Sequence, residues 1–373
     1  MHKPKIAIVA DWLTNMGGAE LVVLALHEAF PEAPIYTSTF TPETMPKFKN
    51  LDIRTTYLQN LPLPLRKLHK FFPMLRVDAF KKLDLSEFDI IISSSSAEAK
   101  QVKKTRNDQI HICYCHTPIR YYWSHYEEYK KDPGFGRLNW LIRLAMPFMV
   151  PSLKKADYKA AQAVDIFIAN SSEVQTRIKK YYNKPSIIIH PPVDVSRFEP
   201  TQKRGHYYVA LGRQVPYKRI DLAVAAATEL GLNLKVYGNG SEHQHLLAIA
   251  GPTIEFFTDR FRDASDEAVT EALNSAKGYI FPAEEDFGIV QVEALAAGAP
   301  VIAYNKGGAL DIVQDNESGI LFNKQTVESV VNAIKSAEKT NFSPKLLRQK
   351  AKRFDKSLFI NKMQKIVTNN IND

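Results

Sequence analysis

Short hydrophobic runs alternate along this chain with longer segments of helical spacing. The alternation predicts α/β architecture, in which parallel sheets are covered by helices on both faces. The runs expected to form strands in the first half are residues 5–10, 35–39, 88–93, 110–114, 166–170 and 186–189. The second series comprises residues 207–212, 233–238, 254–257, 278–281, 300–303 and 319–322.

The length of the chain predicts more than one domain. It has 373 residues, whereas single hydrophobic cores seldom grow beyond about 250–300 residues. The chain is expected to leave the first domain near Pro191-Pro192, and the polar stretch 199–206 is expected to link the domains. We therefore predict domains over 1–195 and 196–355, followed by a C-terminal helix over 356–373.

Composition and charge narrow the class of protein. Hydrophobic residues make up 45% and charged residues 24% of the chain, which is ordinary for a globular protein. The net charge of +9 favours acidic partners, but it does not choose between nucleic acid, anionic lipid and phosphate ligands. The beginning of the chain indicates a buried strand rather than a signal peptide, and no apolar run is long enough to span a bilayer. Cys113 and Cys115 are too few for a zinc site and suit a reducing compartment, so we expect a cytoplasmic protein.

Residues 58–82 interleave apolar side chains with cations. This mixture is typical of a segment at a membrane surface, and also of a surface helix that packs its apolar side on a sheet. Both interpretations stay open, and residues 138–155 have a similar character. The apolar and basic members of 58–82 are Leu58, Leu61, Leu63, Leu65, Leu68, Phe71, Phe72, Met74 and Leu75, and Arg66, Lys67, Lys70, Arg76, Lys81 and Lys82.

Two carboxylates, Glu285 and Glu293, stand on either side of Gly288 and the start of an Ala-rich helical segment. The spacing predicts Glu285 in a loop and Glu293 about two turns into the helix. A helix N-terminus attracts phosphate, and a carboxylate further along can accept two ribose hydroxyls. The pattern therefore indicates a nucleotide-sugar site. The alternative is a buried helix with a solvated acidic entry, because Glu is favoured in a first turn.

Cations and a histidine follow other predicted strands. Arg213 and Lys218 come after the first strand of the second domain, where they could stabilise a departing diphosphate. His116 follows a strand of the first domain and could donate to a sugar hydroxyl or exchange protons near neutrality. Gly17 and Gly18 lie between the first strand and a helix, where the backbone can approach a ligand.

In their order along the chain, these motifs resemble the family 4 retaining glycosyltransferases. The resemblance rests on Gly17-Gly18-Ala19-Glu20, Gly212-Arg213 with Lys218-Arg219, the pair Glu285 and Glu293 around Phe287-Gly288, and Gly307-Gly308 before Asp311. It implies the GT-B architecture of two facing Rossmann-like domains, with a C-terminal helix that returns to the first domain.

The resemblance also implies roles for single residues. Arg213 and Lys218 would stabilise the diphosphate, Glu285 would hold sugar hydroxyls, Glu293 would hold the ribose, and His116 would lie near the reaction centre. Arg120, Tyr121, Tyr122 and Trp123 would line the acceptor side. The other expected donor-binding residues are Gly17, Gly18, Gly212, Gly238, Arg262, Asp286, Phe287, Gly288 and Ile289.

The run His116-Thr117-Pro118-Ile119-Arg120-Tyr121-Tyr122-Trp123 is similar to mannosyltransferases that build bacterial surface polysaccharides and O-antigens. This likeness implies transfer of mannose from GDP-mannose to a lipid-linked or membrane-associated glycan, by an enzyme at the inner face of the cell membrane. A UDP-sugar-dependent glucosyl or N-acetylglucosaminyl transferase, and a non-catalytic scaffold that binds sugar nucleotides, stay open as alternatives.

Other classes fit the sequence less well. No Asp-x-Asp pair occurs, so we expect neither a metal in the transfer step nor another cofactor. A nicotinamide-dependent enzyme would need Gly-x-Gly-x-x-Gly after the first strand, where this chain has Asn15-Met16-Gly17-Gly18. A phosphorylase of similar design would need pyridoxal phosphate. Nucleic-acid binding has only the net charge in its favour, so no nucleic-acid partner is expected.

Overall fold

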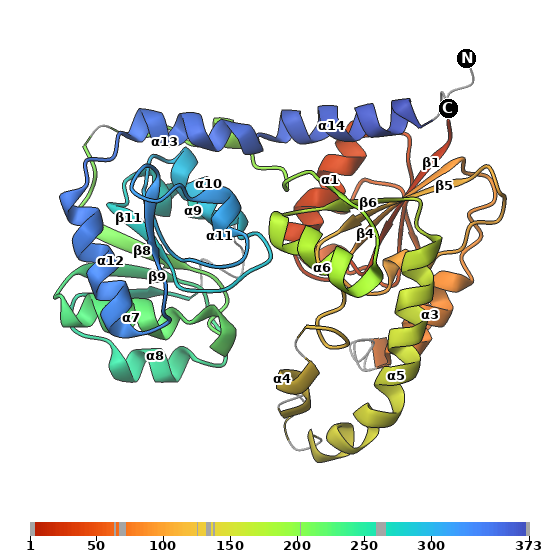
Figure 1. Ribbon diagram of the computed structural model, residues 1–373, viewed down its shortest axis with the longest axis horizontal. Helices are drawn as coiled ribbons and strands as arrows, with labels where there is room; N and C mark the ends of the chain where they lie inside the picture. Colours follow the sequence, from red (N-terminus) through yellow and green to blue (C-terminus); the bar gives the residue numbers. More distant parts are fainter. Residues whose placement is uncertain are drawn as a thin grey trace. The chain divides into compact units, whose positions relative to one another are not determined.

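The computed structural model divides the chain into two compact units (Figure 1). The first unit comprises Met1–His190 with Phe359–Asp373, and the second comprises Pro191–Leu358. The unit limits fall within five residues of the domain limits expected from the sequence. The structure describes residues 4–62, 65–66, 72–124, 126–131, 136, 139–201, 203–258 and 266–370.

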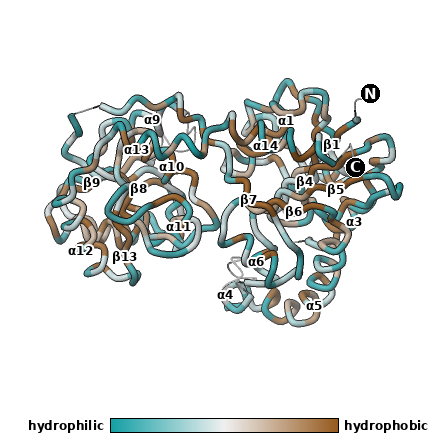
Figure 2. Tube along the Cα trace, turned by 45° about the horizontal axis from the view of Figure 1, so that its top comes forward, coloured by the Kyte–Doolittle hydropathy of each residue, from teal (hydrophilic) through white to brown (hydrophobic). Residues whose placement is uncertain are grey.

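The first unit is built on a parallel sheet of seven strands in the order β3-β2-β1-β4-β5-β6-β7. Consecutive apolar residues such as Ala7, Ile8 and Val9 are all buried, because a parallel sheet is covered on both faces. Figure 2 shows strands β4, β5 and β6 coloured toward the hydrophobic end of its scale. The strands are β1 (Ile6–Ala10), β2 (Ile35–Thr37), β3 (Ile53–Thr55), β4 (Ile90–Ser95), β5 (Ile110–Cys115), β6 (Ile166–Ala169) and β7 (Ile187–Ile188).

Helices cover this sheet, and the last helix of the chain is one of them. Phe359, Met363 and Val367 of α14 belong to the same buried cluster as strands β1, β4 and β5, and Gln364 donates to the carbonyl oxygen of Ala29 at 3.0 Å. The end of the chain therefore completes the core of the first unit. The helices of this unit are α1 (Gly18–Ala29), α3 (Pro73–Lys81), α4 (Tyr126–Lys131), α5 (Asn139–Ala163), α6 (Ser172–Tyr182) and α14 (Lys356–Asn369).

The second unit contains a parallel sheet of six strands in the order β10-β9-β8-β11-β12-β13. Alternate residues of β8 enter different cores: Val209 packs under α9 and α10, and Ala210 packs under α7 and α12. The strands are β8 (Tyr207–Leu211), β9 (Asn233–Tyr237), β10 (Ile254–Phe257), β11 (Gly278–Phe281), β12 (Val301–Tyr304) and β13 (Gly319–Phe322). The helices are α7 (Ile220–Glu229), α8 (His243–Ile249), α9 (Asp266–Asn274), α10 (Ile289–Ala296), α11 (Ala309–Ile312), α12 (Val327–Lys339) and α13 (Pro344–Ala351).

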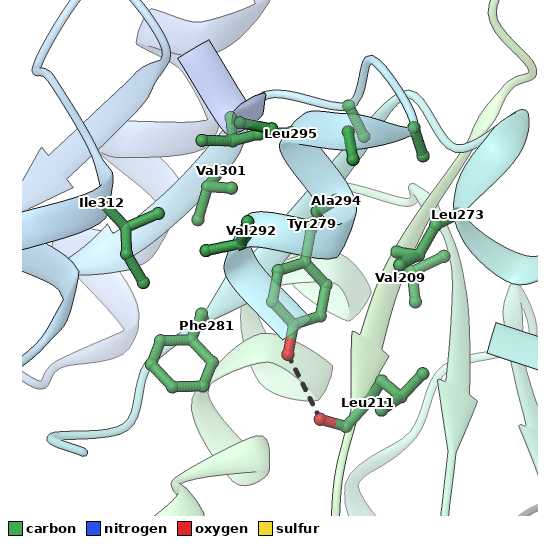
Figure 3. Packing of buried hydrophobic residues seen from close by; sticks show 14 of the residues in the cluster. Val209, Leu211, Leu273, Tyr279, Phe281, Val292, Ala294, Leu295, Val301 and Ile312 are labelled. Carbon is green, nitrogen blue, oxygen red and sulfur yellow. Dashed lines mark hydrogen bonds between the residues drawn. The ribbon is translucent and has the colours of Figure 1, made fainter. Parts of the chain in front are cut away.

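One core of the second unit places α10 directly against the sheet (Figure 3). Val292 and Leu295 of α10 are completely buried there, with Tyr279 of β11. The Tyr279 hydroxyl donates to the carbonyl oxygen of Leu211 at 3.2 Å, so this buried polar group is satisfied. The helix that follows Glu285 is thereby fixed relative to the ends of β8 and β11.

The predicted α/β fold with parallel sheets is confirmed, and each predicted strand matches an observed one. Among the strands of the described residues, the prediction missed only β3, which lies at the sheet edge and pairs with β2 alone. Its three residues are only partly buried or exposed, so it lacks the apolar run by which the other strands were recognised.

His111 in β5 gives the first unit a titratable core group. Burial lowers the pKa of His111 to about 4, although the nearby Asp165 carboxylate opposes the shift. The unfolded chain therefore binds a proton near pH 6.5 that the folded chain does not bind until about pH 4. The resulting stabilisation is present above pH 6.5 and is lost as the pH falls toward 4.

We expect His111→Gln to flatten the pH dependence of unfolding between these limits by up to about 1.4 kcal/mol per pH unit. Glutamine can keep the polar contact with Ser93, whose Oγ lies 2.8 Å from Nε2 of His111. Urea titrations at several pH values measure the effect. Equal slopes for the variant and the wild type would contradict the assignment.

Candidate functional site

In the second unit, two glycines bring the ends of β8 and β9 together. A Cβ atom on Gly238 would lie 2.0 Å from the carbonyl oxygen of Gly212, so no other residue fits there without moving the backbone. Gly212 has a φ of 152° and Gly238 one of 126°, both in the region that favours glycine. The buried amide of Gln214 donates to the Gly238 carbonyl oxygen at 2.7 Å and holds the two loops in register.

Lys218 meets Glu285 beside these loops. Lys218 lies at the end of the short helix Pro216–Lys218, and Glu285 lies between β11 and α10. The Lys218 ammonium donates to the Glu285 carboxylate, and their side chains are 18% and 17% exposed. The structure therefore joins two residues that the sequence analysis placed in one site from positions far apart in the chain.

The double glycine Gly307-Gly308 supports the loop of Glu285. The Gly308 amide donates to the Glu285 carbonyl oxygen at 2.8 Å. A Cβ atom would lie 2.3 Å from that oxygen if placed on Gly307, and 2.2 Å from the Cα of Phe287 if placed on Gly308. Only glycine permits this approach, which explains why the pair follows β12 at this point.

The prediction that Glu293 lies two turns into the helix was wrong. Gly288 takes a left-handed conformation with a φ of 86°, so α10 begins only at Ile289. Glu293 is the fifth residue of α10, about one turn from its start. Asp286 and Phe287 therefore lie in the loop before the helix, together with Glu285.

Glu293 has an ionic partner that the sequence analysis did not identify. Its carboxylate accepts a hydrogen bond of 2.9 Å from the guanidinium of Arg197. Burial, and next the negative charge of Glu293, raise the pKa of the Tyr279 hydroxyl. Arg197 stands in a short helix before β8, just ahead of the stretch 199–206 that was expected to link the domains, and no spacing rule links it to Glu293.

Arg213 and Lys218 share a neighbour, Tyr217. The Arg213 guanidinium donates to the Tyr217 hydroxyl at 3.2 Å, and the Lys218 ammonium lies 5.7 Å from the centre of the Tyr217 ring. The cations of Arg213 and Lys218, the Glu285 carboxylate and the exposed ring of Tyr217 thus lie together at the carboxyl end of β8. Ligands of open α/β sheets bind at this edge.

In the first unit, His116 lies at the carboxyl edge of the sheet. It follows β5, and its Nε2 is 2.8 Å from Oγ of Ser94, at the end of β4. Asn170, after β6, donates to the carbonyl oxygen of His116 at 3.0 Å. Gly17 caps α1 in extended conformation and Gly18 is the first residue of that helix, in agreement with the predicted strand-to-helix turn.

Three aromatic residues expected on the acceptor side make internal hydrogen bonds. The Tyr121 hydroxyl donates to Glu98 at 2.9 Å, and the indole of Trp123 donates to Asp157 at 2.7 Å. Tyr122 is 2% exposed, and Arg120 is partly buried. Tyr122 and Trp123 also line an open pocket of about 450 Å³, whose other walls come from Ser124, Tyr126, Glu127, Val150, Pro151 and Lys154.

The predictions for Arg262 and for the basic apolar segment 58–82 fall partly or wholly on residues that the structure does not describe. Arg262 lies outside the described residues, as do residues 63–64 and 67–71 of the basic apolar segment. Within that segment, Leu58 and Arg76 are buried, so these two residues do not face a membrane. Phe72, Met74 and Leu75 remain exposed.

Comparison with known protein families identifies the family of this chain. Residues 16–197 match the family model described as Glycosyltransferase Family 4, and residues 194–354 match the model described as Glycosyl transferases group 1. The chain belongs to glycosyltransferase family 4. The Gly212, Lys218 and Glu285 cluster lies within the second match, and His116 lies within the first.

Curated relatives of this glycosyltransferase match it over part of their length. A GDP-mannose-dependent alpha-(1-6)-phosphatidylinositol monomannoside mannosyltransferase of Mycobacterium tuberculosis is 28% identical over 216 residues, which cover 50% of this chain and 56% of that protein. A D-inositol 3-phosphate glycosyltransferase of Streptomyces avermitilis is 29% identical over 190 residues, which cover 43% and 41%. The chain spans about half the length of such relatives.

Solved structures resemble the glycosyltransferase over almost its entire length. Sucrose-phosphate synthase of Thermosynechococcus elongatus has a TM-score of 0.72 at 17% identity and covers 98% of this chain and 99% of its own. Anabaena Alr3699/HepE in complex with UDP has a TM-score of 0.69 at 16% identity, with coverage of 98% and 100%. These likenesses show the GT-B fold.

Proposed function

We propose that this glycosyltransferase transfers a hexose with retention of configuration, from GDP-mannose to a lipid-linked or membrane-associated glycan. The observation that carries the proposal is the contact between Lys218 and Glu285. The contact supports the proposal because a cation suits a diphosphate, a carboxylate suits sugar hydroxyls, and α/β sheets bind nucleotides at the carboxyl ends of their strands. A surface ion pair of no function would not need the glycines that hold both loops in place.

The residues divide the work as follows. Lys218 and Arg213 stabilise the negative charge that grows on the diphosphate as the bond to the sugar breaks. Glu285 orients the sugar through its hydroxyls, and Glu293 accepts hydrogen bonds from the ribose. The acceptor hydroxyl attacks on the face from which the diphosphate leaves, and its proton passes to the phosphate. Backbone amides at residues 286–289 add donors to the sugar or phosphate.

The other expected site residues have proposed roles in donor and acceptor binding. Gly212 and Gly238 make room for the nucleotide. Gly17 and Gly18 allow the backbone to approach the donor, and His116 donates to a sugar hydroxyl. Trp123, which is only partly buried and lines the open pocket with Tyr122, would receive part of the acceptor, because aromatic faces suit sugars. Two cations supply the charge stabilisation, so the proposal requires no metal in the transfer step.

The choice of donor is supported by the relatives. The Mycobacterium tuberculosis protein described above is named as GDP-mannose-dependent. A GDP-mannose-dependent alpha-mannosyltransferase of the same organism is 31% identical over 141 residues, which cover 35% of this chain and 36% of that protein. The phosphatidylinositol mannoside in the first name is a lipid-linked saccharide, in line with the proposed acceptor.

Thermal unfolding with and without sugar nucleotides tests the donor. At about 100 times its dissociation constant, GDP-mannose should stabilise the protein by roughly 2.7 kcal/mol, and GDP should share part of the effect. Glu293→Gln should weaken the shift by removing a charged acceptor for the ribose. Selective stabilisation by a UDP or ADP sugar would overturn the mannosyl assignment. If no nucleotide stabilised the chain, the proposed donor site would be refuted.

A further inference from the structure

The N-terminal half of α5 exposes large apolar side chains on one face. Trp140 is 65% exposed, Leu144 is 63% exposed and Phe148 is 80% exposed. Residues four apart lie on the same side of a helix, so these three form a continuous stripe, and the exposed Leu141 adjoins it. Single exposed apolar residues are common on proteins, whereas a stripe of this kind marks an interaction surface.

The core of the first unit does not use this stripe. Its contacts with α5 are made by the opposite face, through Val150, Leu153 and Ala161, all buried. Val150 and Leu153 pack with Val77 of α3 and with Ile119. Figure 1 shows α5 running beside α3. The helix is therefore anchored toward its C-terminal end, and the apolar stripe lies on the part before that anchor.

The exposed charges of α5 favour an anionic partner. The only acid in α5 is Asp157, which is completely buried and pairs with Lys100 at 2.6 Å. Lys155 and Lys159 are exposed and continue the outward face beyond Phe148. At about 1.5 Å per residue they lie on the order of 10–16 Å further along the helix. Apolar residues therefore give way to cations along one face.

A basic hollow lies beside the same helix. Lys130 and Lys131 of α4 and Arg143 of α5 line it together with Glu127, and its volume is about 320 Å³. Three cations face one carboxylate, so the hollow carries net positive charge and suits a phosphate group. Arg143 also donates to the carbonyl oxygen of Lys131, which ties the two helices together.

We propose that the stripe formed by Trp140, Leu144 and Phe148 inserts into the surface of an anionic bilayer, and that the hollow between α4 and α5 binds a lipid phosphate. An interfacial helix of this type buries its apolar face about 5–10 Å deep, and lysines then lie at the level of the headgroups. Anionic lipid supplies both the apolar layer and the negative charge that this surface demands. A second copy of the chain would bring the same positive charges and repel it.

The proposal deepens the function proposed above, since it gives the enzyme a means to reach a lipid-linked acceptor. The proposed contact is peripheral: the α5 stripe enters only the surface layer of the bilayer. Among the residues that the structure describes, no helix has the length and apolar character needed to cross a bilayer. It also differs from the sequence expectation, which centred membrane contact on residues 58–82 and only noted a similar character in 138–155.

Vesicle co-sedimentation of the full chain tests the proposal. The wild type should bind phosphatidylcholine vesicles that contain roughly a third phosphatidylglycerol, and should bind pure phosphatidylcholine much more weakly. The triple variant Trp140→Ser/Leu144→Ser/Phe148→Ser should lose about tenfold or more of the affinity. A matched control replaces three exposed apolar residues elsewhere, Ile187→Ser/Leu247→Ser/Leu346→Ser, and should bind as the wild type does.

A charge variant separates the hollow from the stripe. Lys130→Gln/Lys131→Gln/Arg143→Gln should retain weak binding to neutral vesicles and lose the preference for phosphatidylglycerol. Absence of wild-type binding, an equal loss in the control triple, or a wild-type dimer that the stripe variant converts to monomer would each overturn the proposal. Stabilisation by GDP-mannose, measured on the same variants, should be unchanged, so a failure of membrane docking is distinguished from a failure of the proposed function.

Discussion

Replacing Lys218 with alanine is expected to lower the rate of sugar transfer by about 100-fold or more, which corresponds to about 2.7 kcal/mol of transition-state stabilisation. The ammonium lies against Glu285 in a largely buried position, where a charge acts more strongly than in bulk water. Its interaction should grow as charge develops on the diphosphate. The loss should therefore appear in kcat and not only in KM.

Glu285→Ala is expected to cause a loss of the same order, because it removes the carboxylate that orients the sugar and leaves Lys218 without its partner. Transfer of radiolabelled mannose from GDP-mannose, measured on both variants, gives the comparison. The double variant should lose less than the product of the two single losses, since the residues act together. Lys335→Ala, an exposed lysine on α12, is the control and should retain wild-type rates. Near-wild-type rates for Lys218→Ala and Glu285→Ala would refute the site.

The elements and the motif positions could be predicted because both depend on local patterns. Buried parallel strands require apolar runs, and a loop that touches another loop requires glycine, as Gly238 does against Gly212. The order of these signals along the chain was enough to predict the family. The same order placed Lys218 and Glu285 in one site although the residues are 67 positions apart, but it did not predict their ion pair.

Contacts that follow no local pattern could not be predicted. Arg197 approaches Glu293 only through the path of the chain before β8, which no periodicity records. Glu293 itself was misplaced by about a turn, because the left-handed Gly288 delays the start of α10. The start of a helix depends on one backbone angle, whereas its existence depends on many residues.

The clearest failure concerns burial of charge. The sequence analysis counted Arg76 among the cations of residues 58–82, a segment interpreted either as lying at a membrane surface or as a surface helix packed on a sheet. Both interpretations leave its cations in solvent, as Lys and Arg usually are. The structure buries Arg76 and Glu98 almost completely, with two hydrogen bonds of 2.7 and 2.9 Å between them. Tyr121 also donates to Glu98, so the pair supports the loop of residues expected on the acceptor side. Burial alone would lower the pKa of Arg76, but Glu98, together with Tyr121 and Tyr122, more than offsets this effect and raises the pKa.

Arg76→Met is therefore expected to destabilise the first unit by about 3–5 kcal/mol, because it leaves the Glu98 carboxylate buried without its cation. Denaturation in urea, followed by circular dichroism, measures the loss. The double variant Arg76→Met/Glu98→Gln should recover more than half of it, since a neutral amide is far less costly to bury than a charge. Lys82→Met, which breaks the exposed pair with Asp78 just after the same helix, should cost less than about 1 kcal/mol. If Arg76→Met and Lys82→Met had equal effects, the ion pair would contribute no more than a surface contact, and the support of the acceptor-side loop would have to come from the packing of Tyr121 and Tyr122 alone.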